Sequence, residues 1–246
     1  MLQKISRKRI REIVIEDHLF ASVLHYFGIP FYDYEDHTLE EVCKENSILP
    51  SEVVAHYESQ CRSAVKLDFR DYSIEVLVAY LKHGHKRFIK ELLPYHAELV
   101  RKSFDKHPTE YLQDLNLIFP IFVEDFIRHI YHEEDTLFHY IHALRRYARF
   151  KDNYTEVVYL MEHHSIAHFA MEHADEDEME GIRSLTGNYT KFKNTDLCYA
   201  VLLQELKAFD EALQHHAYIE NHLLFQKAYH LENYVKKALG ETIKLN

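Results

Sequence analysis

One ten-residue pattern, H-x-Y-x-E-x-x-x-L-F, occurs twice in this chain, beginning at His129 and again at His216. Both copies lie in long stretches whose apolar residues recur every three or four positions, a spacing typical of an amphipathic helix. Residues four apart share one face of a helix, so each copy places a histidine and a glutamate one turn apart on the apolar stripe. The pattern therefore requires long helices that carry ligand-type side chains into an apolar interior.

Four helical stretches follow Tyr72, and the connections between them are short. This organisation predicts an all-α fold in which residues 67–246 form an up-down-up-down four-helix bundle. Only five glycines and five prolines occur in 246 residues, which excludes a turn-rich all-β fold. The expected helices cover residues 73–104, 109–148, 155–184 and 194–239, with Gly240 as the stop of the last one.

The first part of the chain, residues 1–66, has shorter helical patterns separated by breakers. One of them opens with Thr38 and Glu41 in T-x-x-E spacing, which predicts a capping box at a helix N-terminus. Helices this short are not stable alone, so they are expected to pack together. The sequence thus predicts a small N-terminal helical module.

The formal net charge is −11, which leaves no polycationic face for nucleic acid or an anionic membrane. The longest uninterrupted apolar run, Leu117 to Val123, is far shorter than a membrane span, and charges interrupt the first twenty residues, so no signal peptide is expected. Three cysteines without CxxC spacing are typical of a reducing compartment. We therefore expect a cytoplasmic protein that binds neither membrane nor nucleic acid, and its oligomeric state is left open.

Histidine is unusually frequent, with 20 residues in 246, and helical register separates those on the buried stripes from the rest. In the first long helix His85 continues the apolar stripe, whereas His83 falls off it, although both stay candidates. In the third, His173 shares a face with apolar residues. His132 and His215 lie next to the motif residues but point outward. The acidic run 175–180 is interpreted as a solvated face.

The stripes thus place four histidines and two glutamates in one bundle interior. A lone buried carboxylate costs several kcal/mol, and bound cations remove that cost. Imidazole with carboxylate and no thiolate suits iron, manganese or zinc. Six ligands are too many for one tetrahedral zinc but fit two ions that share bridging carboxylates. The alternative is a metal-free bundle in which histidine and glutamate bond internally. The predicted metal ligands are His85, His129, Glu133, His173, His216 and Glu220.

These segments resemble the hemerythrin-like (HHE) cation-binding domain, and the chain as a whole resembles the iron–sulfur cluster repair di-iron proteins. The matching segments are HKRFIKELLP, HIYHEEDTLF, AMEHADE and HAYIENHLLF. The resemblance implies the same six ligands, with Glu133 and Glu220 bridging two non-haem iron ions that also share an oxo bridge, and manganese or zinc as substitutes. It further implies that Asp125 and Glu172 line a path to the metals.

The resemblance also implies a function in nitrosative and oxidative stress. A small diatomic ligand, nitric oxide or oxygen, would bind at the di-iron centre, and damaged iron–sulfur proteins would be partners. An alternative is a non-enzymatic sensor of oxygen, nitric oxide or iron that uses the same ligands, so whether the chain is an enzyme stays open. One departure concerns the N-terminal module, where the family carries a Cys-Cys pair. Here that loop, residues 31–36, contains no cysteine, which puts any dithiol role of the module in doubt.

Overall fold

The computed structural model describes residues 2–62, 68–173, 177–190 and 196–245. Within these ranges the chain is all-helical, and the β-type pairing is limited to an isolated bridge between Arg9 and Thr38. The prediction of an all-α fold is confirmed. None of the described helices is both long and apolar enough to cross a membrane.

The chain divides into two compact units, each assembled from three segments of sequence. Unit 1 contains Met1–Leu67, Tyr95–Leu117 and Arg183–Ala208. Unit 2 contains Asp68–Pro94, Ile118–Ile182 and Phe209–Asn246. All six predicted metal ligands belong to unit 2.

Unit 1 includes the short N-terminal helices, which pack on one another as expected, with α5 beside α1, α3 and α4. The predicted capping box is present at the start of α4, where the backbone amide of Thr38 donates to Glu41 Oε2 at 2.8 Å. The loop without cysteines begins with a short 3-10 helix, Phe31–Asp33. The five helices are α1 (Leu2–Ser6), α2 (Ile10–Glu16), α3 (Leu19–Tyr26), α4 (Leu39–Glu45) and α5 (Pro50–Arg62).

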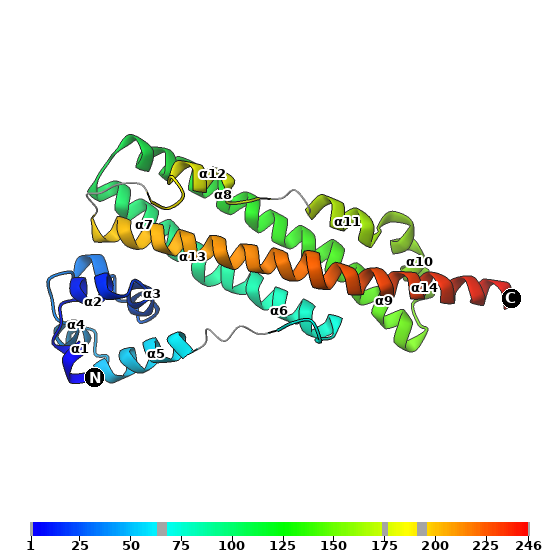
Figure 1. Ribbon diagram of the computed structural model, residues 1–246, viewed down its shortest axis with the longest axis horizontal. Coiled ribbons are helices and arrows are strands. Elements are labelled where there is room, and N and C mark those ends of the chain that lie inside the picture. Colours follow the sequence, from blue (N-terminus) through cyan, green and yellow to red (C-terminus); the bar gives the residue numbers. More distant parts are fainter. Residues whose placement is uncertain (1, 63–67, 174–176, 191–195, 246) are drawn as a thin grey trace. The chain divides into compact units, whose positions relative to one another are not determined.

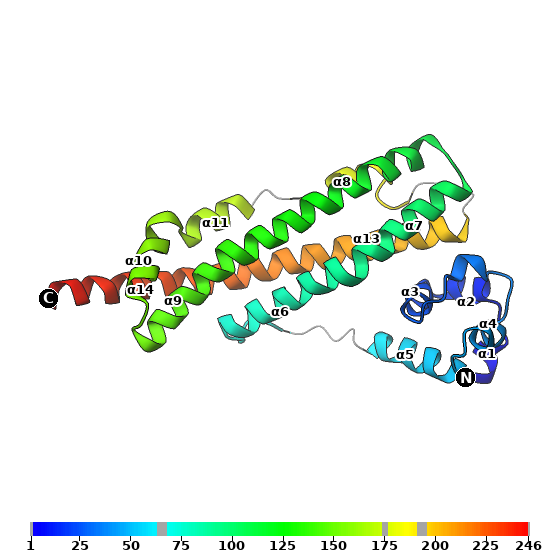
Figure 2. The same cartoon turned by 180° about the vertical axis from the view of Figure 1, so that it is seen from behind.

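Unit 2 holds the helices that surround the predicted ligands. In Figures 1 and 2, α14 (Phe225–Leu245) lies beside both α9 (His139–Phe150) and α11 (Ile166–His173). The chain reverses from α9 into α10 (Tyr154–His163) through two residues with left-handed backbone, Lys151 and Asn153. Helix α6 (Ile74–Arg87) packs against the turn formed by Glu220–Leu224.

Three of the four predicted long helices are present as continuous helical runs. The first comprises α6 and α7 (Leu93–Lys106), and the second comprises α8 (Glu110–Glu133) and α9. The fourth comprises α13 (Leu197–Ile219) and α14, and it continues through Gly240 to Leu245. The prediction that Gly240 stops this helix was therefore wrong. A single glycine costs a helix interior only about 1 kcal/mol, which flanking turns offset.

The third predicted helix, 155–184, is not continuous. It is replaced by α10, α11 and α12 (Glu180–Leu185), and residues 174–176 lie outside the described part of the chain. The physical reason for the first break is Ser165, whose Oγ accepts a hydrogen bond from the backbone amide of His168 at 3.2 Å. That bond caps the N-terminus of α11, so a new helix starts where the periodicity alone predicts an uninterrupted one.

Each of the three continuous runs contains one turn of π-helix close to a predicted ligand. These turns are Phe88–Leu92, Glu134–Phe138 and Glu220–Leu224. A π turn carries one residue more than an α turn, which lets the residues on both sides of it stay on one face. Such turns are frequent at functional sites, and here they follow His85 and Glu133 or begin at Glu220.

The core of unit 2 continues beyond the ligands as one apolar cluster. Its largest fully buried side chain is Tyr140, whose hydroxyl donates to the buried Glu232 carboxylate at 2.6 Å. The cluster confirms the helical register expected for the second and fourth runs, because the residues placed on the stripes are inside. These buried stripe residues include Leu137, Tyr140, Leu144 and Leu224.

Candidate metal centre

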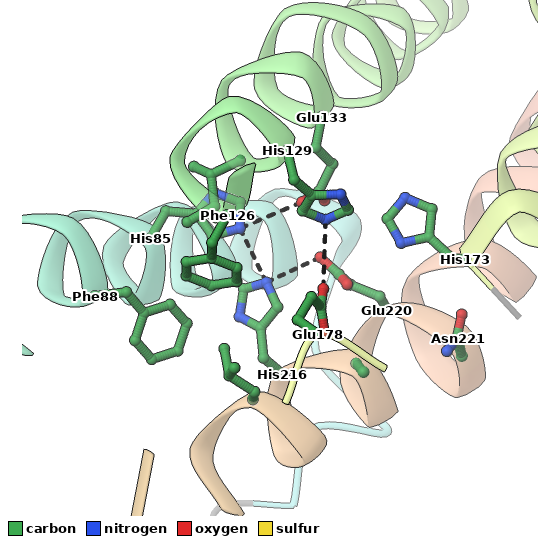
Figure 3. A pocket seen from close by; sticks show the side chains of 13 residues that line it. His85, Phe88, Phe126, His129, Glu133, His173, Glu178, His216, Glu220 and Asn221 are labelled. Atoms are coloured by element: carbon green, nitrogen blue, oxygen red, sulfur yellow. Dashed lines mark hydrogen bonds and ion pairs between the residues drawn. The ribbon is translucent and has the colours of Figure 1, made fainter. Parts of the chain in front are cut away.

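Four ligand-type side chains converge on one point of unit 2 (Figure 3). They are His85 on α6, Glu133 at the end of α8, His216 on α13 and Glu220 at the start of the last π turn. Each offers one ligand atom, and these atoms all lie within 4.8 Å of one another. The four residues come from three helical runs that are far apart in sequence, so only the fold brings them together.

Short distances join these four residues. His85 Nε2 lies 3.0 Å from His216 Nε2 and 3.3 Å from Glu133 Oε2. His216 Nε2 lies 3.0 Å from Glu220 Oε1. Nitrogen and oxygen atoms that carry lone pairs therefore face a common centre.

The two remaining predicted ligands, His129 and His173, line the same cavity but lie outside this closest group. Their ring centroids are 5.4 Å apart, and His173 comes from the end of α11 (Figure 3). All six predicted residues thus surround one cavity, while their role as metal ligands stays a prediction.

The histidines that the register excluded from the stripes point away from this cavity. His83, His132 and His215 are all exposed, whereas His85 is buried. Of these two candidates on the first long helix, His85 lines the cavity and His83 does not, while the role of His85 as a ligand stays a prediction.

The cavity between the six side chains is small and has an apolar wall. Its volume is about 30 Å³, room for one or two particles the size of a water molecule. Phe88 and Phe126 line it, and the Phe138 ring stacks on His85 with centroids 5.7 Å apart. Side chains that could bind a cation are therefore held in surroundings that largely exclude bulk water.

Burial sets the protonation of the central groups. Burial, together with the nearby charge of Glu220, raises the pKa of Glu133 to about 7. Burial lowers the pKa of His216 to about 4, so its imidazole is neutral at pH 7. Burial likewise lowers the pKa of His173. Two carboxylates that oppose each other's ionisation, beside neutral imidazoles, form a donor set that a cation would stabilise.

His85 is oriented by a carboxylate outside the cavity. Its Nδ1 lies 3.0 Å from Glu134 Oε1, and Glu134 Oε2 lies 2.9 Å from Lys82 Nζ. Burial alone would lower the pKa of His85, but the hydrogen bond to Glu133 and the neighbouring carboxylates outweigh it and raise that pKa. Because Nδ1 is engaged by Glu134, Nε2 is the nitrogen that faces the cavity. This arrangement is typical of histidines that bind metals.

The donor set therefore fits a bound metal ion. Each of the four central residues offers an imidazole nitrogen or a carboxylate oxygen, and no thiolate is among them. Nitrogen and oxygen donors of this kind suit iron, manganese and zinc alike, so the geometry does not identify the metal.

Glu178 is a residue of this site that the sequence analysis missed. It lies in the acidic run interpreted as a solvated face, yet it lines the cavity, and its Oε1 is 3.8 Å from His129 Nε2. Asp177, Glu178 and Glu180 are exposed, as that interpretation expects, but the Glu178 side chain also lines the cavity. The local signal in the sequence is that this run continues about one helical turn beyond His173, where Asp177 stands. Periodicity does not reveal the break before α12. An acidic residue in this polar run is therefore taken for an ordinary surface residue.

The two acidic residues implied by the resemblance lie in different surroundings. Asp125 lines a second cavity that adjoins the first. Glu172 is exposed, and its Oε2 lies 3.7 Å from His168 Nδ1.

Comparison with models of known protein families gives no match for this chain, and comparison with curated proteins gives no match either. The support for a metal centre is therefore the geometry and chemistry of the described residues: a buried, closely spaced cluster of histidine and glutamate side chains.

Proposed function

We propose that this chain is a di-iron, non-haem protein of the nitrosative and oxidative stress response, with a hemerythrin-like four-helix bundle around the metals. Its activity would be iron–sulfur cluster repair or nitric oxide chemistry. The observation that carries the proposal is the cavity lined by four histidines and three glutamates, among them all six predicted ligands. Manganese or zinc are the alternatives that the same donors accept.

The residues divide into two roles. Glu133 and Glu220 would bridge the two ions, because their carboxylates approach the same point from two different helical runs. The histidines His85, His129, His173 and His216 would be terminal ligands. Bound iron would supply redox chemistry and open positions for a small ligand.

The protein's own contribution is to orient donors and limit what reaches them. Glu134 and Lys82 hold His85 with Nε2 inward, and the phenylalanine walls keep bulk water away. A cavity of about 30 Å³ is far below the roughly 300 Å³ of pockets that take organic ligands. An organic ligand of that kind is therefore too large for this cavity, which supports a small ligand.

The first test is metal content with the visible spectrum of protein purified anaerobically and aerobically. About two irons per chain, with charge-transfer bands of an oxo-bridged pair, are expected. Less than one metal per chain after reconstitution with iron would refute the proposal.

A matched pair of variants tests the ligand assignment. His129→Ala removes a residue of the cavity, whereas His132→Ala removes an exposed histidine three residues away. We expect loss of bound metal, measured as metal per chain, in the first and none in the second. Glu220→Ala should behave like His129→Ala. Equal loss in both histidine variants would contradict the assignment.

Turnover separates the proposed activity from a binding function. Consumption of many equivalents of nitric oxide under anaerobic conditions, or reactivation of an enzyme with a damaged iron–sulfur cluster, would support it. Binding of one stoichiometric equivalent without turnover would instead identify a non-enzymatic sensor that uses the same site.

A further inference from the structure

A second, larger cavity adjoins the metal cavity. It has a volume of about 460 Å³ and lies between α8 and the segment that leads into α12. Its wall is largely apolar. The residues that form this apolar part include Ile118, Ile121, Phe122 and Ile182. We call it the outer cavity.

The outer cavity and the metal cavity share three lining residues, Phe126, His129 and Glu178. The side chains of His129 and Glu178 are 27% and 32% exposed, whereas those of His85 and Glu133 are 2% exposed. The border between the cavities is therefore the side from which the metal cavity is reached, and the His129–Glu178 pair stands on it.

The Glu178 carboxylate affects more than its nearest neighbour. Burial lowers the pKa values of His173 and His216, and the charge of Glu178 acts on both in the opposite direction. In Figure 3 the Glu178 side chain points from its segment toward His129. Its negative charge thus reaches two imidazoles of the metal cavity besides the nearby His129.

We propose that Glu178 forms the mouth of the metal cavity and selects neutral small molecules over anions. This inference rests on the proposed function and adds the basis of its ligand selectivity. The apolar outer cavity favours neutral, poorly hydrated molecules such as nitric oxide and oxygen. The ionisable side chains that line it, apart from His129, are the carboxyl groups of Asp125, Asp177 and Glu178. Of these acids, Glu178 alone also lines the metal cavity, so an anion must pass its charge at close range.

The test compares two probes on iron-loaded protein, azide as an anion and nitric oxide as a neutral molecule. Azide association with the oxidised protein and nitric oxide association with the reduced protein are followed by stopped-flow absorption. The variant is Glu178→Gln. The matched control is Glu180→Gln, which removes the same charge from an exposed residue that lines neither cavity.

We expect the ratio of the azide rate to the nitric oxide rate to rise about fivefold in Glu178→Gln, the effect of removing one unit charge at roughly 4 Å in water. The control should keep the ratio of the unchanged chain. Added salt should speed azide association in the unchanged chain more than in Glu178→Gln, because it screens the repulsion.

Metal content, measured first on the same samples, separates the possible failures. Bound iron with an unchanged ratio, or an equal change in the control, would overturn the role of Glu178 alone. A lack of bound iron would refute the proposed function, and with it this inference.

Discussion

Replacing Glu134 by glutamine tests whether the metal centre depends on a residue outside the cavity. Glu134 contacts His85 Nδ1 at 3.0 Å and Lys82 Nζ at 2.9 Å, so it links a cavity histidine to a cation. Burial alone would raise the pKa of Glu134, but the hydrogen bonds from Lys82 and His85 lower it, so the side chain is ionised at pH 7. Glutamine keeps the shape of the side chain and an acceptor oxygen. It loses the negative charge that makes the His85 imidazole a stronger ligand for a metal ion.

The expected loss is about 10- to 100-fold in metal affinity, which is the usual effect of removing a carboxylate behind a metal-binding histidine. That corresponds to about 1.4 to 2.7 kcal/mol. The assay is a competition titration of zinc or iron against a chromophoric chelator, which yields a dissociation constant for each variant. The free energy of unfolding of the metal-free protein should change far less, because Glu134 is partly exposed.

Asp135→Asn is the matched control for Glu134→Gln. Asp135 is the next residue in the same π turn and is exposed, so the variant removes one negative charge at nearly the same place. We expect its dissociation constant to stay within about twofold of the unchanged chain, given that surface charges act weakly. Equal weakening in the two variants would refute the orienting role of Glu134 and leave only a general effect of charge.

Gly84→Ala and Glu133→Gln probe the metal cavity, and Gly240→Ala is the matched control for the first of them. In Gly84→Ala the new Cβ would lie 3.3 Å from His216 Nδ1, so we expect weaker metal binding in the same titration. In Gly240→Ala the new Cβ meets no atom within 4 Å, so the metal affinity should stay unchanged and the free energy of unfolding should gain about 1 kcal/mol. Equal metal affinities of the two alanine variants would contradict the prediction. Folded Glu133 has a pKa of about 7 against an ordinary 4.5, so the contribution of this residue to the stability of the metal-free chain falls as pH rises from 4.5 to 7. Glu133→Gln has no group that titrates at this position. The free energy of unfolding of this variant, measured in urea, should therefore rise relative to that of the unchanged chain by up to about 3 kcal/mol between pH 4.5 and pH 7. A difference that stays constant with pH would refute the reasoning.

Helical periodicity predicted that His129 rather than His132 turns inward and favoured His85 over His83, but it did not single out the buried His96. His129 and His132 are three residues apart, and His83 and His85 only two, yet one of each pair lines the cavity and the other is exposed. The reason is that a helix turns 100° per residue, so the direction of a side chain follows from its position relative to the apolar stripe. The capping box at Thr38 was predictable for the same reason, since its hydrogen bonds are local.

Other features could not be read from periodicity. The π turns add one residue to a helical turn without an obvious change in the apolar pattern, so they are visible only in backbone hydrogen bonds. The break of the third helix at Ser165 has a local signal, a serine that can cap, but serine also occurs inside helices. Glu134 and Glu178 take their importance from partners 49 residues away or on another helix, which no local pattern reveals.

By itself, the sequence determined the helical nature of the chain, the register of its stripes and the six side chains that can reach a common interior. Those properties depend on neighbours within about one or two helical turns. Only the tertiary structure decided that four of the six place ligand atoms within 4.8 Å and that His129 and His173 stand further out. It also decided that an acidic residue, Glu178, lines this cavity. Such distances depend on how separate helices pack, and they are set by the fit of side chains across the interface.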